Sequence, residues 1–273
     1  MVGIFAVVIV LGYVITLATD PGYFFIIMII ASLFSIFYVW FSYYNSDKIA
    51  VASVGAKEAS REKHKDFYNL VEGLTIASGL PMPKLYIMNS ENINAFATGR
   101  DPKHAVICVT EGALKKLERR ELEGVLAHEL GHVASYDIRY MTLVAVAVGM
   151  VSIISQIFLR SLWFGGGRSS NDKGNAIYFI VAIALAILAP IVVFFVQMSI
   201  SRKREFVADA SAVKFTRYPR GLIGALKKIK QENKEPEKKV SKVVAPLFIS
   251  NPLKGLGATH PPIEKRIAVL ERM

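Results

Sequence analysis

The sequence predicts a predominantly helical α+β fold, in which a domain with a small sheet is joined to four transmembrane helices. Of the 273 residues, 53% are hydrophobic, a larger share than an ordinary soluble domain contains. These residues cluster into four long uncharged stretches instead of spreading along the chain. The polar segments between them show helical periodicity and short strand patterns, which are typical of a globular domain.

Each apolar stretch is long enough, or nearly so, to cross a bilayer, whose core of about 30 Å needs roughly 20 helical residues. The stretches cover 2–18, 23–41, 141–158 and 177–198. No basic residue precedes the first stretch, and only residues 19–22 separate it from the second. We therefore expect a transmembrane hairpin instead of a cleaved signal peptide, with a hairpin buried in a soluble domain as the remaining alternative.

Lysine and arginine near the span ends predict the orientation, because they concentrate in cytoplasmic loops. One side carries Lys48, Lys57, Arg61, Lys63, Lys65, Arg139, Arg202, Lys203 and Arg204. The other side carries Arg160, Arg168 and Lys173. We therefore expect a multi-pass protein of the cell (inner or cytoplasmic) membrane, with both chain ends and the large polar segments in the cytoplasm.

This topology divides the chain into four segments. They are a transmembrane hairpin at 1–44, the first half of a cytoplasmic domain at 45–140, a second hairpin at 141–200, and the second half of the domain at 201–273. The cytoplasmic domain is therefore assembled from two segments that the second hairpin separates.

The first half of this domain is expected to open with a helix that runs through Ala77. Helical spacing relates His64, Phe67, Leu70, Val71 and Leu74. Gly79, Pro81 and Pro83 then end the helix, and a short strand is expected at 84–90.

Two more short strands are expected at 94–99 and 105–110, joined by a turn. Thr110 is suited to cap a short helix that ends near Leu117. The next helix begins near Arg120. Its apolar residues recur at spacings of three and four: Leu122, Val125, Leu126, Leu130 and Val133.

The second half of the domain is expected to be helical. Residues 201–215, 221–229 and 263–270 have helical patterns, the last directly after two prolines. The charge-rich stretch 231–242 is expected to be a mobile linker or an exposed helix end.

The segment HELGH at 128–132 predicts a zinc site on the helix that begins near Arg120. Positions four apart share one face of a helix, so His128 and His132 can offer two imidazole nitrogens to one ion. Zinc polarises a bound water, and Glu129 can take its proton as the water attacks a peptide carbonyl. The alternative is a chance match. Gly131 weakens the helix, which a close approach by another helix would justify.

A catalytic zinc takes three protein ligands, so the third must come from elsewhere in the chain. Glu205 is the strongest candidate, because Asp209 follows one turn later and can accept the other ring N–H of a ligand histidine. Alternatively, the two carboxylates form an exposed acidic face that balances the basic residues 202–204. His132 precedes one predicted span and Glu205 follows the next by similar distances, so an antiparallel hairpin would bring them together at the cytoplasmic membrane surface.

The net charge of +11 invites a nucleic-acid interpretation. The sequence has no basic stripe interleaved with aromatics and no nucleic-acid module, so no nucleic-acid partner is expected, and anionic lipid headgroups account for the charge. Cys108 is the single cysteine, which excludes an intramolecular disulfide, and it is expected to be a small buried apolar residue. His64 and His104 are expected to be solvated or packed.

Four segments carry a resemblance to a known family: HELGH, SRKREFVADA at 201–210, NAFATG at 94–99 and THPPIEKRI at 259–267. Together they resemble the HtpX-type integral-membrane zinc metalloproteases, of the gluzincin group that includes the CAAX prenyl proteases. The similarity spans nearly the whole chain and is much more specific than HELGH alone, which many families share. It implies a gluzincin zinc-protease domain.

The resemblance implies a role for each matching residue. Glu205 would be the third ligand of one zinc ion per chain, and Asp209 would support a ligand histidine. His260 would help to stabilise the oxyanion at the scissile carbonyl, and Arg266 would help to anchor that segment. An edge strand that pairs with an extended substrate would consist of Asn94, Ala95, Phe96 and Ala97. Without the resemblance, Asn94 is interpreted as a turn residue and His260 as a structural loop residue.

The resemblance also implies a membrane-embedded endopeptidase that cleaves misfolded or damaged membrane proteins beside an ATP-dependent membrane protease. The expected partners are therefore polypeptide substrates, membrane lipids and that protease. The chain has no GxxxxGK[ST] segment, so substrates must unfold themselves or be presented. Two alternatives stand beside this one. A CAAX-type prenyl-protein protease is disfavoured by only four spans, and a non-catalytic membrane chaperone or scaffold is disfavoured by the intact chemical groups.

Overall fold

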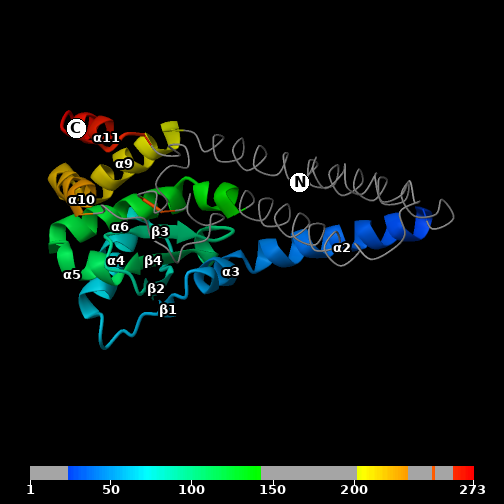
Figure 1. Cartoon of the computed structure of the whole chain (residues 1–273). Helices are drawn as coiled ribbons and strands as arrows, with labels where there is room; N and C mark the ends of the chain where they lie inside the picture. The colour runs from blue at the N-terminus through cyan, green and yellow to red at the C-terminus, as the bar shows by residue number, and fades with distance from the viewer. Residues whose placement is uncertain (1–23, 143–201, 233–247, 250–260) are drawn as a thin grey trace, which may run out of the picture. The chain divides into compact units, whose positions relative to one another are not determined.

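The computed structural model describes residues 24–142, 202–232, 248–249 and 261–273 (Figure 1). The chain divides into two units. Among the described residues, the first unit contributes helix α2 (Phe24–Tyr44), and the second holds every other element.

Helix α2 covers the predicted span 23–41. Many of its apolar side chains are exposed: Phe25, Ile26, Ile29, Ile30, Leu33, Phe34, Ile36, Phe37, Trp40 and Phe41. Within the described ranges, no helix combines the length and apolarity of a membrane span. The predicted spans 2–18, 141–158 and 177–198 lie almost entirely outside those ranges. The four transmembrane helices therefore stay a prediction.

The second unit contains a mixed sheet with the strand order β1-β2-β4-β3. The strands are β1 (Lys57–Glu58), β2 (Lys84–Met88), β3 (Ala95–Thr98) and β4 (Val106–Thr110). β2 and β4 run parallel, whereas β1 and β3 are antiparallel to their neighbours. The three strands predicted from the sequence are confirmed as β2, β3 and β4, and β3 lies at an edge of the sheet.

The helix predicted through Ala77 is wrong in its first part. The chain instead forms a short helix, α3 (Ser46–Ser53), then β1, and only then α4 (Lys65–Ser78). Gly55 ends the helical path with a φ of 63°, a left-handed conformation that glycine adopts without steric cost. Strand β1 then pairs with β2, so sheet formation overrides the helical pattern upstream of α4.

The helices that follow the sheet begin where the sequence predicts. Helix α5 (Glu111–Lys116) is capped by the Thr110 hydroxyl, which accepts the Ala113 N–H at 3.1 Å. Helix α6 (Arg119–Ala134) starts with the Glu118 N–H bonded to the Glu121 carboxylate at 2.8 Å. A 3-10 turn, η2 (Pro102–His104), lies between β3 and β4.

Apart from residues 248–249, the described part of the second half is helical, as predicted. It contains α9 (Arg202–Thr216), α10 (Pro219–Glu232) and α11 (Ile263–Leu270). Most of the predicted linker at 231–242 lies outside the described residues.

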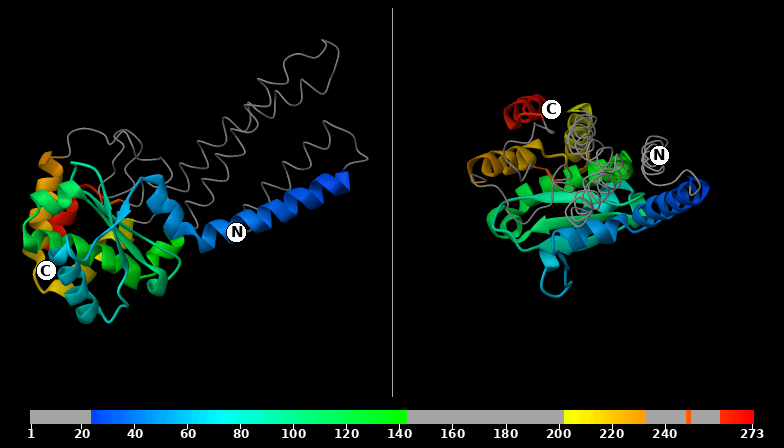
Figure 2. Two further views of the ribbon diagram at one scale, coloured as in Figure 1. Left: turned by 90° about the horizontal axis from the view of Figure 1, so that it is seen from below. Right: turned by 45° about the vertical axis from the view of Figure 1, so that its right-hand side comes forward.

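Helix α6 is central to this unit (Figure 1, Figure 2). It packs against β3 and α4 on the side of the sheet and against α9 and α10 on the other side, and α11 lies on α9 and α10. Leu126, Leu130 and Val133 of α6 are fully buried between these layers. The two halves of the domain therefore share one core, and side chains from the second half reach the buried face of α6.

Candidate metal centre

All of HELGH is buried within α6, including the three residues that carry its chemistry: His128, Glu129 and His132. The two imidazole rings meet edge to face, with their centroids 4.8 Å apart. Their Nε2 atoms are separated by 3.2 Å. Both histidines therefore direct Nε2 to one point, as their spacing predicts.

Helix α9 brings Glu205 to the same point. Its carboxylate oxygens lie 3.7 Å from His128 Nε2 and 3.6 Å from His132 Nε2. One ligand atom from each of the three residues lies within 4.8 Å of the other two, and all three residues are buried. Two imidazole nitrogens and one carboxylate form a donor set of the kind that catalytic zinc sites use.

Glu129 lies on the same helix and is almost completely buried. Its carboxylate accepts a hydrogen bond from the Ala97 backbone N–H, whereas its Oε1 atom has no hydrogen-bond partner in the part of the chain that the structure describes. A buried polar atom without a partner costs about 1–3 kcal/mol. A hydrated ion held by the neighbouring ligands would supply that partner, so the residues fit a zinc site.

Asp209 supports His128 from behind. Its Oδ1 atom lies 2.9 Å from His128 Nδ1. Arg266 of α11 donates to both oxygens of this carboxylate, from Nη2 at 2.6 Å and from Nε at 2.9 Å. The contact that the sequence predicts between Asp209 and a ligand histidine is therefore present, and Arg266 ties α11 to α9.

Asp137 contacts His132 in the same way, although the spacing of the two residues did not predict this contact. Its Oδ2 atom lies 3.1 Å from His132 Nδ1, and its Oδ1 atom accepts from Nη1 of Arg204 at 2.7 Å. Asp137 comes just after α6 ends, so helical spacing does not relate it to His132. The sequence does contain one signal for this contact, because Asp137 follows His132 by five residues. Its carboxylate can reach the ring if the chain turns back after the helix.

The three central groups have shifted pKa values. Burial lowers the pKa of His128 to about 4. Burial also raises the pKa of Glu129 to about 7. For His132, burial acts to lower the pKa, but the hydrogen bond to Asp137 and the neighbouring carboxylates outweigh it and raise the pKa to about 9. Since zinc binds neutral imidazole, zinc binding must displace a proton from His132.

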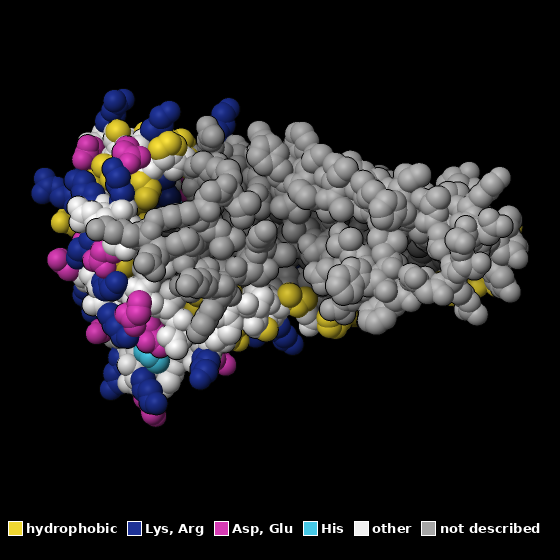
Figure 3. Space-filling model, viewed as in Figure 1, with side chains coloured by type: hydrophobic (Ala, Val, Ile, Leu, Met, Phe, Trp, Pro, Cys, Tyr) yellow, Lys and Arg dark blue, Asp and Glu magenta, His cyan; other side chains and the backbone are white. Residues whose placement is uncertain are grey.

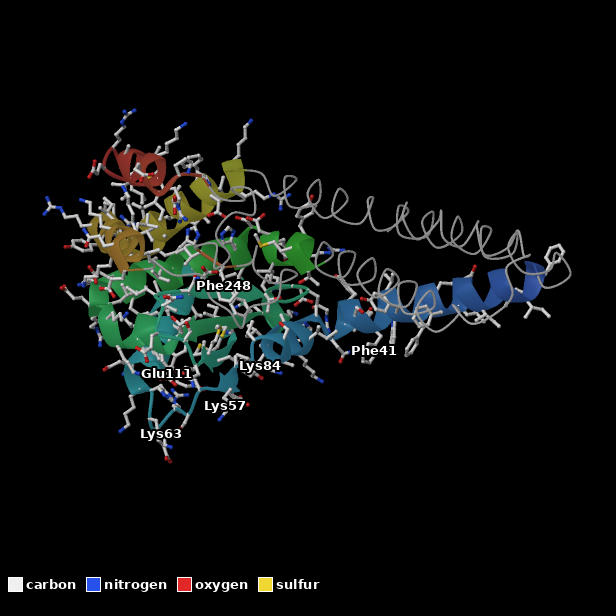
Figure 4. All side chains as sticks on the ribbon, in the orientation of Figure 1. Phe41, Lys57, Lys63, Lys84, Glu111 and Phe248 are labelled. Carbon is white, nitrogen blue, oxygen red and sulfur yellow. The ribbon has the colours of Figure 1, made fainter. Side chains whose placement is uncertain are left out.

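The predicted edge strand lies beside this cluster. Asn94 precedes β3, whose members Ala95, Phe96 and Ala97 are buried. The outer edge of β3 contacts Phe248, which forms an antiparallel bridge with Phe96, and the Ile249 N–H donates to the Ala95 carbonyl at 2.9 Å (Figure 4). An extended segment of the chain itself therefore pairs along this edge.

The remaining residues singled out in the sequence are His260, His64, His104 and Cys108. His260 is outside the described residues. His64 precedes α4 with its ring near the Ser60 carbonyl, and His104 pairs with Asp101 at the surface. Cys108 is buried in β4, where burial raises the pKa of its thiol.

Charged side chains of both signs are interspersed over the described surface on the face shown in Figure 3. Several form exposed pairs, among them Lys115 with Glu91 and Lys230 with Glu264. This mixed surface is what a solvated face of a globular domain presents.

Comparisons with known proteins identify the family. The model of peptidase family M48 matches residues 61–273. A "Protease HtpX homolog" of Caldanaerobacter subterraneus subsp. tengcongensis is 45% identical over 253 residues, which cover 90% of this chain and 84% of that protein. A protein of the same name from Listeria monocytogenes serotype 4a is 41% identical over 263 residues, covering 90% and 86%.

The fold is similar to that of a solved structure, Ste24p of S. mikatae. The TM-score is 0.50 at 17% sequence identity, and the match covers 99% of this chain and 67% of that one. This likeness concerns the fold alone. The family model and the relatives, together with the buried His128, His132 and Glu205, show that this chain is a metalloprotease that belongs to peptidase family M48.

Proposed function

We propose that this protein is a membrane-embedded zinc-dependent endopeptidase that hydrolyses misfolded or damaged proteins, membrane proteins among them. The observation that carries the proposal is the buried group of His128, His132 and Glu205 with Glu129 beside it. Family membership supports peptide hydrolysis, and the resemblance to HtpX-type proteases motivates the substrate class.

In this proposal, His128, His132 and Glu205 hold one zinc ion. When bound, zinc polarises a water molecule and lowers its pKa toward neutrality. Glu129 accepts the proton of the attacking water and then delivers it to the leaving amine. Asp209 accepts the N–H of His128 Nδ1, which leaves Nε2 available as a ligand atom.

Backbone pairing along β3 is the proposed mode of substrate binding. The pairing of Ile249 with the Ala95 carbonyl supports it, because the edge accepts an extended segment, which a substrate strand would replace. The hydrogen bond from the Ala97 N–H to Glu129 ties the same strand to the general base. A substrate strand bound there would present a peptide bond next to Glu129. His260 completes the proposal as the residue that stabilises the oxyanion.

We further infer that the spans near 2–18, 23–41, 141–158 and 177–198 anchor the protease domain at the cytoplasmic face of the cell membrane. The uncharged sequences of these stretches support this arrangement, as do the exposed apolar side chains of α2. Substrates then arrive from the membrane or its surface, and an ATP-dependent membrane protease is the proposed partner.

The test uses the purified full-length chain in detergent, loaded with zinc, and unfolded β-casein as substrate. The parent should bind about one zinc ion per chain and cleave casein, given the donor set. Glu129→Gln should bind zinc equally well and lose about 10²-fold or more in cleavage rate. Glu123→Gln, on the same helix and paired with Arg120 at 2.8 Å, is the matched control and should cleave like the parent.

Two outcomes would contradict the proposal. Cleavage by Glu129→Gln at the parental rate would reject Glu129 as the general base. A zinc-loaded parent that leaves casein intact would favour the non-catalytic chaperone or scaffold.

A further inference from the structure

We propose that Asp137 is a positioning residue for the metal centre, which holds the His132 ring with Nε2 toward the metal, and that Arg204 holds Asp137 in place. This inference rests on the proposed function, since it concerns the same site. It assigns a role to two residues that have no place in the chemistry derived above.

The geometry around His132 is the first argument. Asp137 Oδ2 lies 3.1 Å from Nδ1, on the opposite side of the ring from Nε2. A carboxylate accepts but does not donate, so the contact requires a proton on Nδ1 and leaves Nε2 as the ring nitrogen for the metal. Nε2 in turn faces His128 Nε2 at 3.2 Å and Glu205 Oε1 at 3.6 Å. Asp137 therefore selects the tautomer that a ligand histidine needs.

The backbone that presents Asp137 is the second argument. Helix α6 ends at Ala134, and Tyr136 follows with a φ of 58°, which is left-handed and unusual for a large side chain. Such a conformation costs on the order of 1–2 kcal/mol. The turn places Asp137 back beside His132 instead of continuing away from α6. The strained residue, Tyr136, thus lies directly beside Asp137, which contacts His132.

The Asp137 carboxylate is buried and forms an ion pair with Arg204. Its Oδ1 atom accepts from Arg204 Nη1 at 2.7 Å, and the Arg204 guanidinium also stacks over the Tyr140 ring at 4.6 Å. A buried carboxylate requires such a cation, because its desolvation is otherwise costly. Both oxygens of Asp137 are thus engaged, one by His132 and one by Arg204.

The bond between Arg204 and Asp137 also affects the position of α9. Arg204 directly precedes Glu205 in α9, so its bond to Asp137 joins the start of α9 to the segment that follows α6. The same contact that orients His132 therefore also fixes the helix turn that supplies the third ligand.

His128 and His132 consequently have parallel supports, His128–Asp209–Arg266 and His132–Asp137–Arg204. The two differ in exposure: the Arg266 side chain is 1% exposed, whereas that of Arg204 is 38% exposed. Arg204 can therefore be substituted at the edge of the site without leaving a cavity in the core.

The test measures metal binding, not activity. Full-length chains carrying Glu129→Gln, which cannot digest themselves under the proposed mechanism, are titrated with Zn²⁺ against a chelator and with Co²⁺ while its visible absorption is recorded. Three substitutions are added separately: Asp137→Ala, Asp137→Asn and Arg204→Gln. Asp101→Ala is the matched control, because Asp101 pairs with His104 at 2.7 Å on the exposed surface.

Asp137→Ala should raise the Zn²⁺ Kd about 10–100-fold and change the Co²⁺ spectrum, as loss of a carboxylate behind a ligand histidine does. Asp137→Asn keeps an acceptor oxygen, so its Kd should lie between those of the parent and Asp137→Ala. Arg204→Gln should also weaken binding, and Asp101→Ala should not. Thermal unfolding of the metal-free chains separates the two roles: a purely structural residue would lower the midpoint without changing the Kd or the spectrum of folded molecules.

A parental Kd and spectrum in Asp137→Ala would overturn the proposal, as would an equal loss in Asp101→Ala. If Asp137→Ala does not fold, the other two variants decide the matter. A rise of about threefold or more in the Zn²⁺ Kd of Asp137→Asn or Arg204→Gln then supports the proposal, and parental values in both variants reject it. None of these outcomes depends on casein cleavage, so failure here is distinct from failure of the proposed function.

Discussion

Gly131 of α6 and Ala208 of α9 approach so closely that a Cβ atom at Gly131 would lie 3.0 Å from the Ala208 Cα. The sequence predicts a close approach by another helix as the reason for glycine inside HELGH, and this contact confirms the prediction. Because Glu205 lies one turn before Ala208, the glycine sets the separation between the helix that carries the two histidines and the helix that carries Glu205.

Gly131→Ala should therefore weaken zinc binding, although alanine is the better helix former by about 1 kcal/mol. The added methyl group must push α9 away from α6, which moves Glu205 from the histidines. Zinc titration of the full-length chain is the measurement. Gly73→Ala in α4 is the control, because a Cβ there meets no atom within 4 Å, and it should leave the zinc Kd unchanged. Parental affinity in Gly131→Ala would show that the contact does not govern the site.

Glu205→Gln should reduce zinc affinity by at least about 10-fold, since the amide keeps the shape of the side chain but loses the negative charge that holds a divalent cation. The stoichiometry of bound zinc after dialysis checks this result. Lys115 pairs with Glu111 at the surface, so Glu111→Gln serves as the charge-matched control. If Glu205→Gln retains zinc as the parent does, another residue is the third ligand.

Arg266→Met should destabilise the metal-free domain by about 3–5 kcal/mol, because it leaves the buried Asp209 carboxylate without its cation. Urea unfolding of the metal-free chain measures this change. The control is Arg119→Met, whose partner Asp66 lies at the surface, and it should cost about 0–1 kcal/mol. Similar losses in the two variants would argue against a special role for the buried pair.

The raised pKa of Glu129 predicts a pH-dependent difference between the metal-free parent and its Glu129→Gln variant. A carboxyl group whose folded pKa is raised binds its proton more tightly in the folded state, so it lowers stability as the pH rises. The effect begins near the ordinary value of about 4.5 and is complete above about 7. Glu129→Gln should therefore match the parent near pH 4 and become the more stable chain by pH 8.

Unfolding of both metal-free chains at several pH values tests this prediction. A constant difference from pH 4 to pH 8 would mean that Glu129 has an ordinary pKa in the folded protein.

The chemical core of the site could be predicted from the sequence because its geometry is local. His128 and His132 lie one turn apart on any helix, as do Glu205 and Asp209, so their shared faces follow from spacing alone. The start of the first polar segment could not be predicted. Its helical pattern is correct for α4. Before α4, however, Gly55 and the pairing of β1 with β2 interrupt the predicted helix.

Contacts between distant segments needed the folded chain. The pairing of Phe248 with Phe96 joins residues whose patterns do not indicate a common strand edge. The bond between Asp137 and His132 depends on the left-handed turn at Tyr136. A tyrosine does not indicate such a turn in the sequence.

The sequence by itself therefore determined the candidate residues for zinc binding and for the general base, and the helices that carry them. Only the tertiary structure decided how these helices meet, and with that the carboxylate–arginine support behind each histidine. The physical reason is that periodicity encodes only the face of a single helix. The approach of α6, α9 and α11 depends on close packing at points such as Gly131. It also depends on charged groups that form pairs only when folding brings them together.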